Sequence, residues 1–181
     1  MPLAKTRSLS IALVALLAGC AVFSDDPRVR TPGIMIDDQV IETMVKRQIW
    51  NSDPAFDTSH LVAVSYNGVL LLAGQVESAE LKRQAEEIAR GIDKVRKVHN
   101  ELQVGGPISM VARANDSWLT TKVKTKMLAD AEVAARKIKV VTENGTVYLL
   151  GMLPRAEADA AVEAARSVYG VQKIVKVFEY I

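Results

Sequence analysis

The side chains that most often perform chemistry in enzymes are few in this sequence. It contains two histidines, His60 and His99, and one cysteine, Cys20, all far apart in the chain. Neither histidine has a cysteine or a second histidine at metal-ligand spacing, and neither belongs to a recognisable catalytic triad. No glycine-rich phosphate loop is present. The sequence therefore predicts no enzyme, no cofactor, no metal site and no small-molecule substrate, with both histidines either structural or solvent-facing.

Cys20 has a sequence context that indicates covalent lipidation. A basic start is followed by an uncharged apolar run at 9–17, too short to span a bilayer as a helix, and then by LAGC at 17–20. This order is typical of a secretory signal peptide. The quartet resembles the lipobox of bacterial lipoproteins, in which the thiol is diacylated and becomes residue one after cleavage. We expect residues 1–19 to be the signal peptide and Cys20 the lipidation site, the alternative being an unmodified core cysteine.

The charge balance of the mature chain excludes one class of partner. Cleavage before Cys20 removes Lys5 and Arg7 from the 23 basic residues, which leaves 21 to balance the 21 acidic residues. A net charge of zero gives no reason to expect a nucleic-acid partner. Residue 21 is alanine, whereas an aspartate there is associated with inner-membrane retention in enteric-type lipoproteins. The resemblance therefore implies a lipid anchor in the outer membrane, on its periplasmic face.

The rest of the sequence consists of a tether and two copies of one unit. An Asn-Gly pair at 67–68 recurs at 144–145 between two β-rich runs, and the apolar spacing on either side of the pair recurs with it. A Gly-Gly-Pro sequence marks the start of the segment between the copies. The expected segments are a lipidated tether at 20–36, units at 37–104 and 116–181, and between them a linker at 105–115.

Each unit has the pattern of a helix, a hairpin, a second helix and a final strand. Apolar residues at i, i+4 and i+8 form one stripe on the first helix, and Asp38 or Asp116 just before the stripe is expected to be the N-cap. Asn-Gly between strands is typical of a two-residue hairpin turn, because both residues accept positive φ. The order αββαβ predicts an α+β fold, with a three-stranded sheet covered on one face by two helices. The stripes are Ile41, Val45, Ile49 and Leu119, Val123, Met127; second helices are expected at 78–92 and 155–168, and final strands at 98–104 and 174–181.

The hairpins carry a family resemblance. NGVLLLAG at 67–74 and NGTVYLLG at 144–151 resemble the NG-x-V-x-L-x-G core of the BON domain, and GVQKI at 170–174 resembles its GV-x-x-V step. The first copy lacks that glycine and has Asp93 and Lys94 there. A lipobox, a tether and two BON units together resemble the dual-BON outer-membrane lipoproteins. The resemblance implies a periplasmic, non-enzymatic protein that binds anionic phospholipid and supports envelope integrity.

The first helix of the second unit is the expected lipid-binding site. At about 100° per residue, Trp118 points away from the apolar stripe of this helix. Thr121, Lys122 and Thr125 share its side, and Lys124 flanks that side with a further positive charge. An indole beside lysines on an outward helix face suits a membrane interface, where the ring lies among the lipid headgroups. The expected partner is therefore an anionic phospholipid membrane surface.

The sequence leaves two other uses of these surfaces open. Trp118 could pack against the other unit, since a large exposed aromatic side chain usually covers something. The first unit has eight basic and eleven acidic residues, the second ten and eight, and the first has Val40 and Met44 where the second has Trp118 and Lys122. That apolar pair suits a protein contact, including one between the units. The competing function is an adaptor that binds a periplasmic envelope protein or peptidoglycan through its sheet face or the Val40–Met44 patch.

Overall fold

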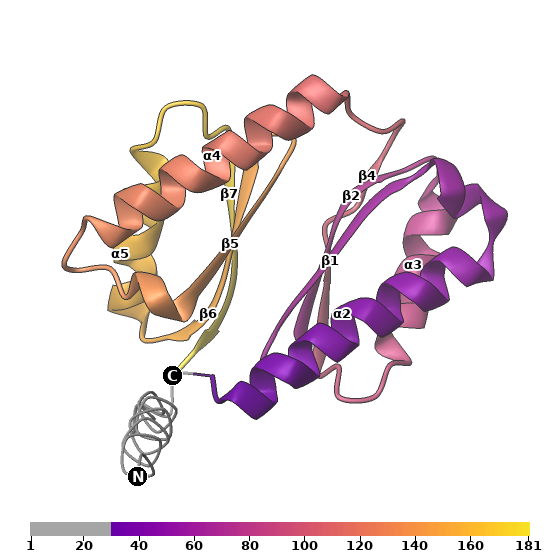
Figure 1. Ribbon diagram of the computed structural model, residues 1–181, viewed down its shortest axis with the longest axis horizontal. Coiled ribbons are helices and arrows are strands. Elements are labelled where there is room, and N and C mark those ends of the chain that lie inside the picture. The colour runs from indigo at the N-terminus through magenta and orange to yellow at the C-terminus, as the bar shows by residue number, and fades with distance from the viewer. Residues whose placement is uncertain (1–29) are drawn as a thin grey trace, which may run out of the picture.

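Two units of the same architecture face each other in the computed structural model, which describes residues 30–181 (Figure 1). The expected signal peptide, Cys20 and the chain up to residue 29 lie outside the described residues. The first unit comprises α2 (Pro32–Ser52), the short 3-10 helix η1 (Pro54–Thr58), β1 (His60–Tyr66), β2 (Val69–Val76), α3 (Ala79–Arg90), β3 (Lys97–Asn100) and β4 (Gln103–Val104). The second comprises α4 (Met110–Leu128), η2 (Ala135–Lys137), β5 (Ile138–Glu143), β6 (Thr146–Leu153), α5 (Arg155–Arg166) and β7 (Lys173–Tyr180). Both confirm the predicted order αββαβ and the α+β fold.

The second hairpin strand is the centre of each sheet. β1 and β2 pair antiparallel, and β2 also pairs in parallel with β3 and β4, which are two pieces of an interrupted final strand. β5, β6 and β7 repeat this arrangement with an unbroken final strand. The turn residues have positive φ, 52° and 74° at Asn67 and Gly68 and 48° and 70° at Asn144 and Gly145. Both Asn-Gly pairs therefore form the hairpin turns that the sequence predicted.

Each sheet is covered by helices on one face and by the other sheet on the opposite face. One apolar cluster lies under α2 and α3 and a second lies under α4 and α5. A third cluster lies between the sheets and takes Tyr66 and Leu71 from the first unit and Tyr148 and Leu150 from the second. Every residue of β2 is buried, because this strand is covered on both faces.

The contact between the units repeats itself about an approximate two-fold axis. Tyr66 Oη donates a hydrogen bond to the carbonyl oxygen of Lys137 at 2.9 Å, and His60 Nε2 lies 3.2 Å from Glu143 Oε2. The repeat makes position 66 equivalent to position 143 and position 60 equivalent to position 137. The two contacts are therefore reciprocal, as in a symmetric interface. In Figure 1 a half-turn in the plane of the picture carries α2 onto α4 and α3 onto α5.

The first helix of each unit begins earlier than the sequence predicted. α2 begins at Pro32, inside the expected tether at 20–36, and α4 begins at Met110, inside the expected linker at 105–115. The side chains of Thr31 and Ser109 accept hydrogen bonds from the first helical turn and so act as N-caps. None of the helices between residues 30 and 181 is long and apolar enough to cross a bilayer.

Candidate functional site

A buried carboxylate fixes α4 against the hairpin of the second unit. The Asp116 carboxylate accepts hydrogen bonds from the backbone N–H of Asn144 at 2.8 Å and of Gly145 at 2.9 Å. The expectation that this residue and Asp38 cap their helices is wrong, because both helices begin earlier and enclose them. Each aspartate instead binds the Asn-Gly turn of its own hairpin. Trp118 follows Asp116 by two residues, so this contact sets where the indole lies.

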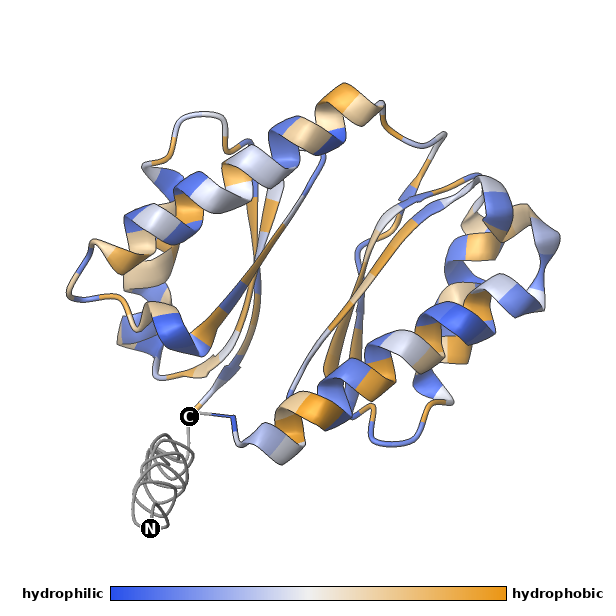
Figure 2. Ribbon diagram, in the orientation of Figure 1, coloured by the Kyte–Doolittle hydropathy of each residue, from blue (hydrophilic) through white to orange (hydrophobic). Residues whose placement is uncertain are grey.

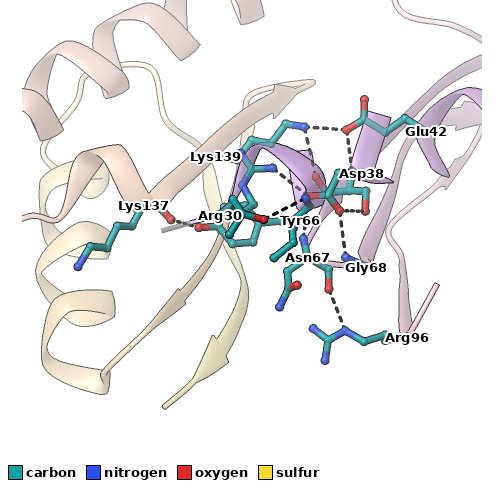
Figure 3. A network of polar contacts seen from close by, with 12 residues as sticks. Arg30, Asp38, Glu42, Tyr66, Asn67, Gly68, Arg96, Lys137 and Lys139 are labelled. Carbon is teal, nitrogen blue, oxygen red and sulfur yellow. Dashed lines mark hydrogen bonds and ion pairs between the residues drawn. The ribbon is translucent and has the colours of Figure 1, made fainter. Parts of the chain in front are cut away.

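Asp38 has the same role in the first unit and two further donors (Figure 3). Besides the backbone N–H of Asn67 and Gly68, Ser65 Oγ donates to it at 2.7 Å and Arg30 Nη1 at 3.0 Å. Burial raises the pKa of Asp38, but these donors, led by Gly68, outweigh burial and hold the pKa below its ordinary value. The carboxylate therefore ties the start of the described chain to the hairpin.

The outward face of α4 carries most of the predicted lipid-binding residues. Trp118 is 62% exposed and lies away from the buried stripe that faces the core. Thr121 and Thr125 are also exposed, and Lys122 is half-buried. Thr121 Oγ1 donates to the carbonyl oxygen of Ser117 at 3.1 Å, so its hydroxyl is satisfied within the helix. These four side chains share one face, and their binding of lipid stays a prediction.

Lys122 connects this face to an aromatic residue that sequence reasoning missed. Lys122 Nζ donates to the carbonyl oxygen of Tyr169 at 3.0 Å. Tyr169 lies in the turn between α5 and β7, and it is 94% exposed. The sequence contained a signal for Tyr169, because this aromatic residue directly precedes Gly170 and a glycine often marks a turn. In the structure Gly170 has a φ of 104°. Lys122 thus follows the exposed Trp118 by one helical turn and is bonded to the backbone of a second exposed aromatic residue.

The outward face of α4 differs from the predicted site in two ways: it begins earlier in the helix, and it does not include Lys124. Met110 and Val111 are highly exposed in the first turn of α4, and at about 100° per residue Val111 lies on nearly the same side as Trp118. They were missed because this segment was expected to be a linker. Lys124 lies on another side of the helix, where it lines a small hollow with Met127, η2 and β5. The structure therefore does not bring Lys124 together with Trp118.

Three of the alternatives left open by the sequence are wrong. Trp118 is exposed and does not pack between the units, because the interface is formed by the two sheets. Val40 and Met44 are exposed on α2 and take no part in that interface either. The sheet faces are buried against each other, so neither sheet face is free to bind a periplasmic protein or peptidoglycan.

Polar contacts between the units lie around the edge of this interface. Lys139 Nζ of the second unit lies 2.7 Å from Glu42 Oε1 of the first and also donates to the carbonyl oxygen of Ser65 (Figure 3). Tyr66, which donates to the Lys137 carbonyl across the interface, is held within its own unit by Arg30, which stacks on its ring 4.2 Å from the centroid. These contacts and the apolar cluster between the sheets hold the two units in one arrangement.

Both histidines are partly buried within the fold. His60 pairs with Glu143 beside a hollow of about 390 Å³ that Arg113 also lines. Burial raises the pKa of Glu143, and its pairing with His60 opposes that rise only in part. Burial lowers the pKa of His99 on β3. No group of three or more His, Cys, Asp or Glu side chains that could hold a metal occurs in the described part of the chain.

Both units match one family model, the BON domain, at residues 37–106 and 115–181. The chain belongs to the BON-domain family. It is 40% identical to the outer membrane lipoprotein DolP of Haemophilus influenzae over 182 residues, which cover 99% of this chain and 93% of that protein. The 21 kDa hemolysin of Actinobacillus pleuropneumoniae is also 40% identical, over 86% of this chain and 79% of its own length. The osmotically-inducible protein Y of Escherichia coli is 32% identical, over 82% of this chain and 75% of its own length.

The relationship covers nearly the whole chain and not only the BON domains. DolP is named as a lipoprotein of the outer membrane and not as an enzyme. The two BON domains of this chain therefore belong to an outer-membrane lipoprotein, as the sequence predicted.

Proposed function

We propose that the protein binds anionic phospholipid through α4 of its second BON domain and thereby supports the integrity of the outer membrane. Lipid on Cys20 would hold the protein on the periplasmic face of the outer membrane. One observation carries the proposal: Trp118 is 62% exposed, opposite the core side of its helix, and shares its face with Lys122, which bonds the backbone of the exposed Tyr169. Large aromatic side chains that cover nothing within a folded protein mark a surface for contact.

The chemistry of this face matches a membrane interface. Indole and phenol rings are amphipathic and settle at the level of the lipid headgroups. A lysine near an anionic surface adds about 1 kcal/mol of attraction, and the second domain has ten basic against eight acidic residues at 116–181. Two or more acyl chains on Cys20 would supply most of the membrane affinity. We therefore assign to α4 the selection of lipid composition and not the attachment itself.

Co-sedimentation of the protein without its lipid anchor with vesicles tests this proposal. The chain from residue 21 lacks the anchor and leaves only its folded surface as the source of attachment, and vesicles of phosphatidylcholine with and without phosphatidylglycerol separate charge from apolar contact. We expect Trp118→Ala to lose binding to the anionic vesicles. Lys122→Glu should weaken the same binding, most strongly at low salt, because exposed charges are screened.

Thermal unfolding of the same variants provides the control. An exposed side chain without a core role changes stability by no more than about half a kcal/mol, so Trp118→Ala should keep the melting temperature of the wild type. Val104→Thr, at an exposed apolar residue on β4, is the matched variant that should keep both stability and binding. Binding of Trp118→Ala as strong as that of the wild type would remove α4 as the lipid site.

A further inference from the structure

α2 of the first BON domain carries an exposed apolar stripe that nothing in the described chain covers. Ile36 is 64% exposed and Val40 48%, and Met44 and Trp50 are exposed as well. At about 100° per residue these four fall within a sector of about 120°. The buried residues Ile41, Val45 and Ile49 lie on the opposite side of the helix. A surface helix normally presents polar residues on its outward face, so this stripe requires an explanation.

The two-fold axis places this stripe on the same face of the molecule as the α4 site. α2 and α4 lie toward the viewer in Figure 1, with α3 and α5 behind them. Both front helices run roughly perpendicular to the approximate axis, one on each side of it. A flat surface laid against this side of the molecule would therefore meet both of them. α2 packs on β1 and α3, and α4 packs on β5 and α5. The outward stripe of each front helix therefore points away from its own sheet and second helix, and the repeat places Val40 of α2 where α4 has Trp118. Figure 2 shows apolar segments recurring along both helices.

The position of α2 in the chain places it next to the proposed anchor. Nine residues lie between Cys20 and Arg30, and an extended chain of ten residue-to-residue steps spans at most about 36 Å. Arg30 is held by Asp38 and by the ring of Tyr66, and α2 begins two residues later. α2 is thus the first element after the tether, and its distance from the bilayer is limited.

The charge on the stripe favours an anionic surface as its occupant. Arg47 and Thr43 lie in the same sector as the apolar residues, and none of the residues there is acidic. The first domain as a whole has more acidic than basic residues, so this sector differs from its surroundings. An apolar stripe with one cation suits the boundary between headgroups and acyl chains.

We propose that α2 is a second membrane-contact site, which engages the anionic lipid surface through Ile36, Val40, Met44 and Trp50 while α4 does the same. The proposal rests on the proposed function for the anchor at Cys20 and adds a contact in the first BON domain. α2 contributes mainly apolar contact, and α4 contributes Trp118 and Lys122. Contact at two helices holds the approximate two-fold axis along the bilayer normal and leaves the side with α3 and α5 facing the periplasm.

The two tryptophans of the chain make this proposal directly testable. The sequence has two, Trp50 and Trp118, one on each helix. In Trp118→Phe the fluorescence reports on α2 alone, and in Trp50→Phe it reports on α4 alone. The mature lipidated protein is reconstituted into vesicles of phosphatidylcholine and phosphatidylglycerol with brominated acyl chains, which quench indole at short range. We expect quenching and a blue shift of Trp50 relative to the same protein in detergent.

A polar substitution in the stripe supplies the matched comparison. Val40→Asn with Met44→Gln, in the Trp118→Phe background, should reduce the quenching of Trp50 by brominated lipid. Val104→Thr in the same background should leave it unchanged. All three positions are exposed, and circular dichroism checks that each variant keeps its helices.

Each outcome of the experiment decides between the two sites. Trp50 unquenched with Trp118 quenched overturns the contact at α2 and leaves the proposed function intact. Trp50 quenched with Trp118 unquenched supports α2 and removes the α4 site, and two unquenched tryptophans overturn both. Shielding of Trp50 from acrylamide in detergent that grows with protein concentration would show that a second copy covers the stripe, and this also overturns the proposal.

Discussion

Replacing Asp116 with alanine tests the contact that positions α4. The variant leaves the backbone N–H of Gly145, which is buried, and that of Asn144, which is partly buried, without their acceptor. A buried donor that loses its partner costs about 1–3 kcal/mol. Since water can reach the second donor more easily, we expect a total loss of about 2–4 kcal/mol in the free energy of unfolding.

Thermal unfolding followed by circular dichroism measures this loss. For a chain of this size each kcal/mol corresponds to about 2–4 °C, so the melting temperature should fall by about 5–15 °C. Asp116→Asn keeps one acceptor oxygen and should lose about half as much. The neighbouring exposed Asn115, changed to alanine, is the control and should stay within about half a kcal/mol of the wild type. An Asp116→Ala variant as stable as this control would refute the role of the carboxylate in holding the hairpin.

Two further predictions concern the first domain and its differences from the second. The pKa of Asp38 lies below its ordinary value of 3.8, so its stabilising contribution is complete above that pH and is lost as the pH falls through the lower folded pKa. Asp38→Asn should therefore flatten the decline of stability below about pH 4, which urea unfolding at several pH values would reveal. Lys94 has a φ of 67°, where the second domain has Gly170, and a non-glycine residue there costs about 1–2 kcal/mol. Lys94→Gly should therefore raise the free energy of unfolding by about 0.5–1 kcal/mol, even though it loses the exposed ion pair with Asp37. Gly170→Ala should lower the free energy of unfolding. Urea titrations measure both changes, and the opposite sign for either variant would contradict this account.

The local features of the fold were predictable because they depend on a few neighbouring residues. The Asn-Gly turns require positive φ at two adjacent positions, and the apolar stripes on the helices depend on a spacing of four residues. The helix starts were mispredicted for an equally local reason. Gly-Gly-Pro at 105–107 indicates a break, but the serine that caps α4 follows it by only two residues.

The arrangement of the two domains depends on distant residues, and the sequence pattern did not reveal it. The run VLLLAGQV in β2 is apolar at most positions, which indicates burial on both faces, yet nothing local identifies the second covering layer. Asp38 and Asp116 were assigned to helix caps because an aspartate before an apolar stripe usually has that role. Their partners lie about thirty residues away in the hairpin, and only the folded chain brings them together.

The interface between the sheets determines how far one domain depends on the other. Because both domains use equivalent surfaces, the pair corresponds to a homodimer whose subunits are joined by the short segment before α4. Covalent linkage gives each half a partner at an effective concentration in the millimolar range, however sparsely the protein is distributed over a membrane. A half-length chain would expose Val64, Tyr66 and Leu71 on its sheet, which the second sheet covers here. Tandem duplication thus makes the contact between the sheets independent of expression level.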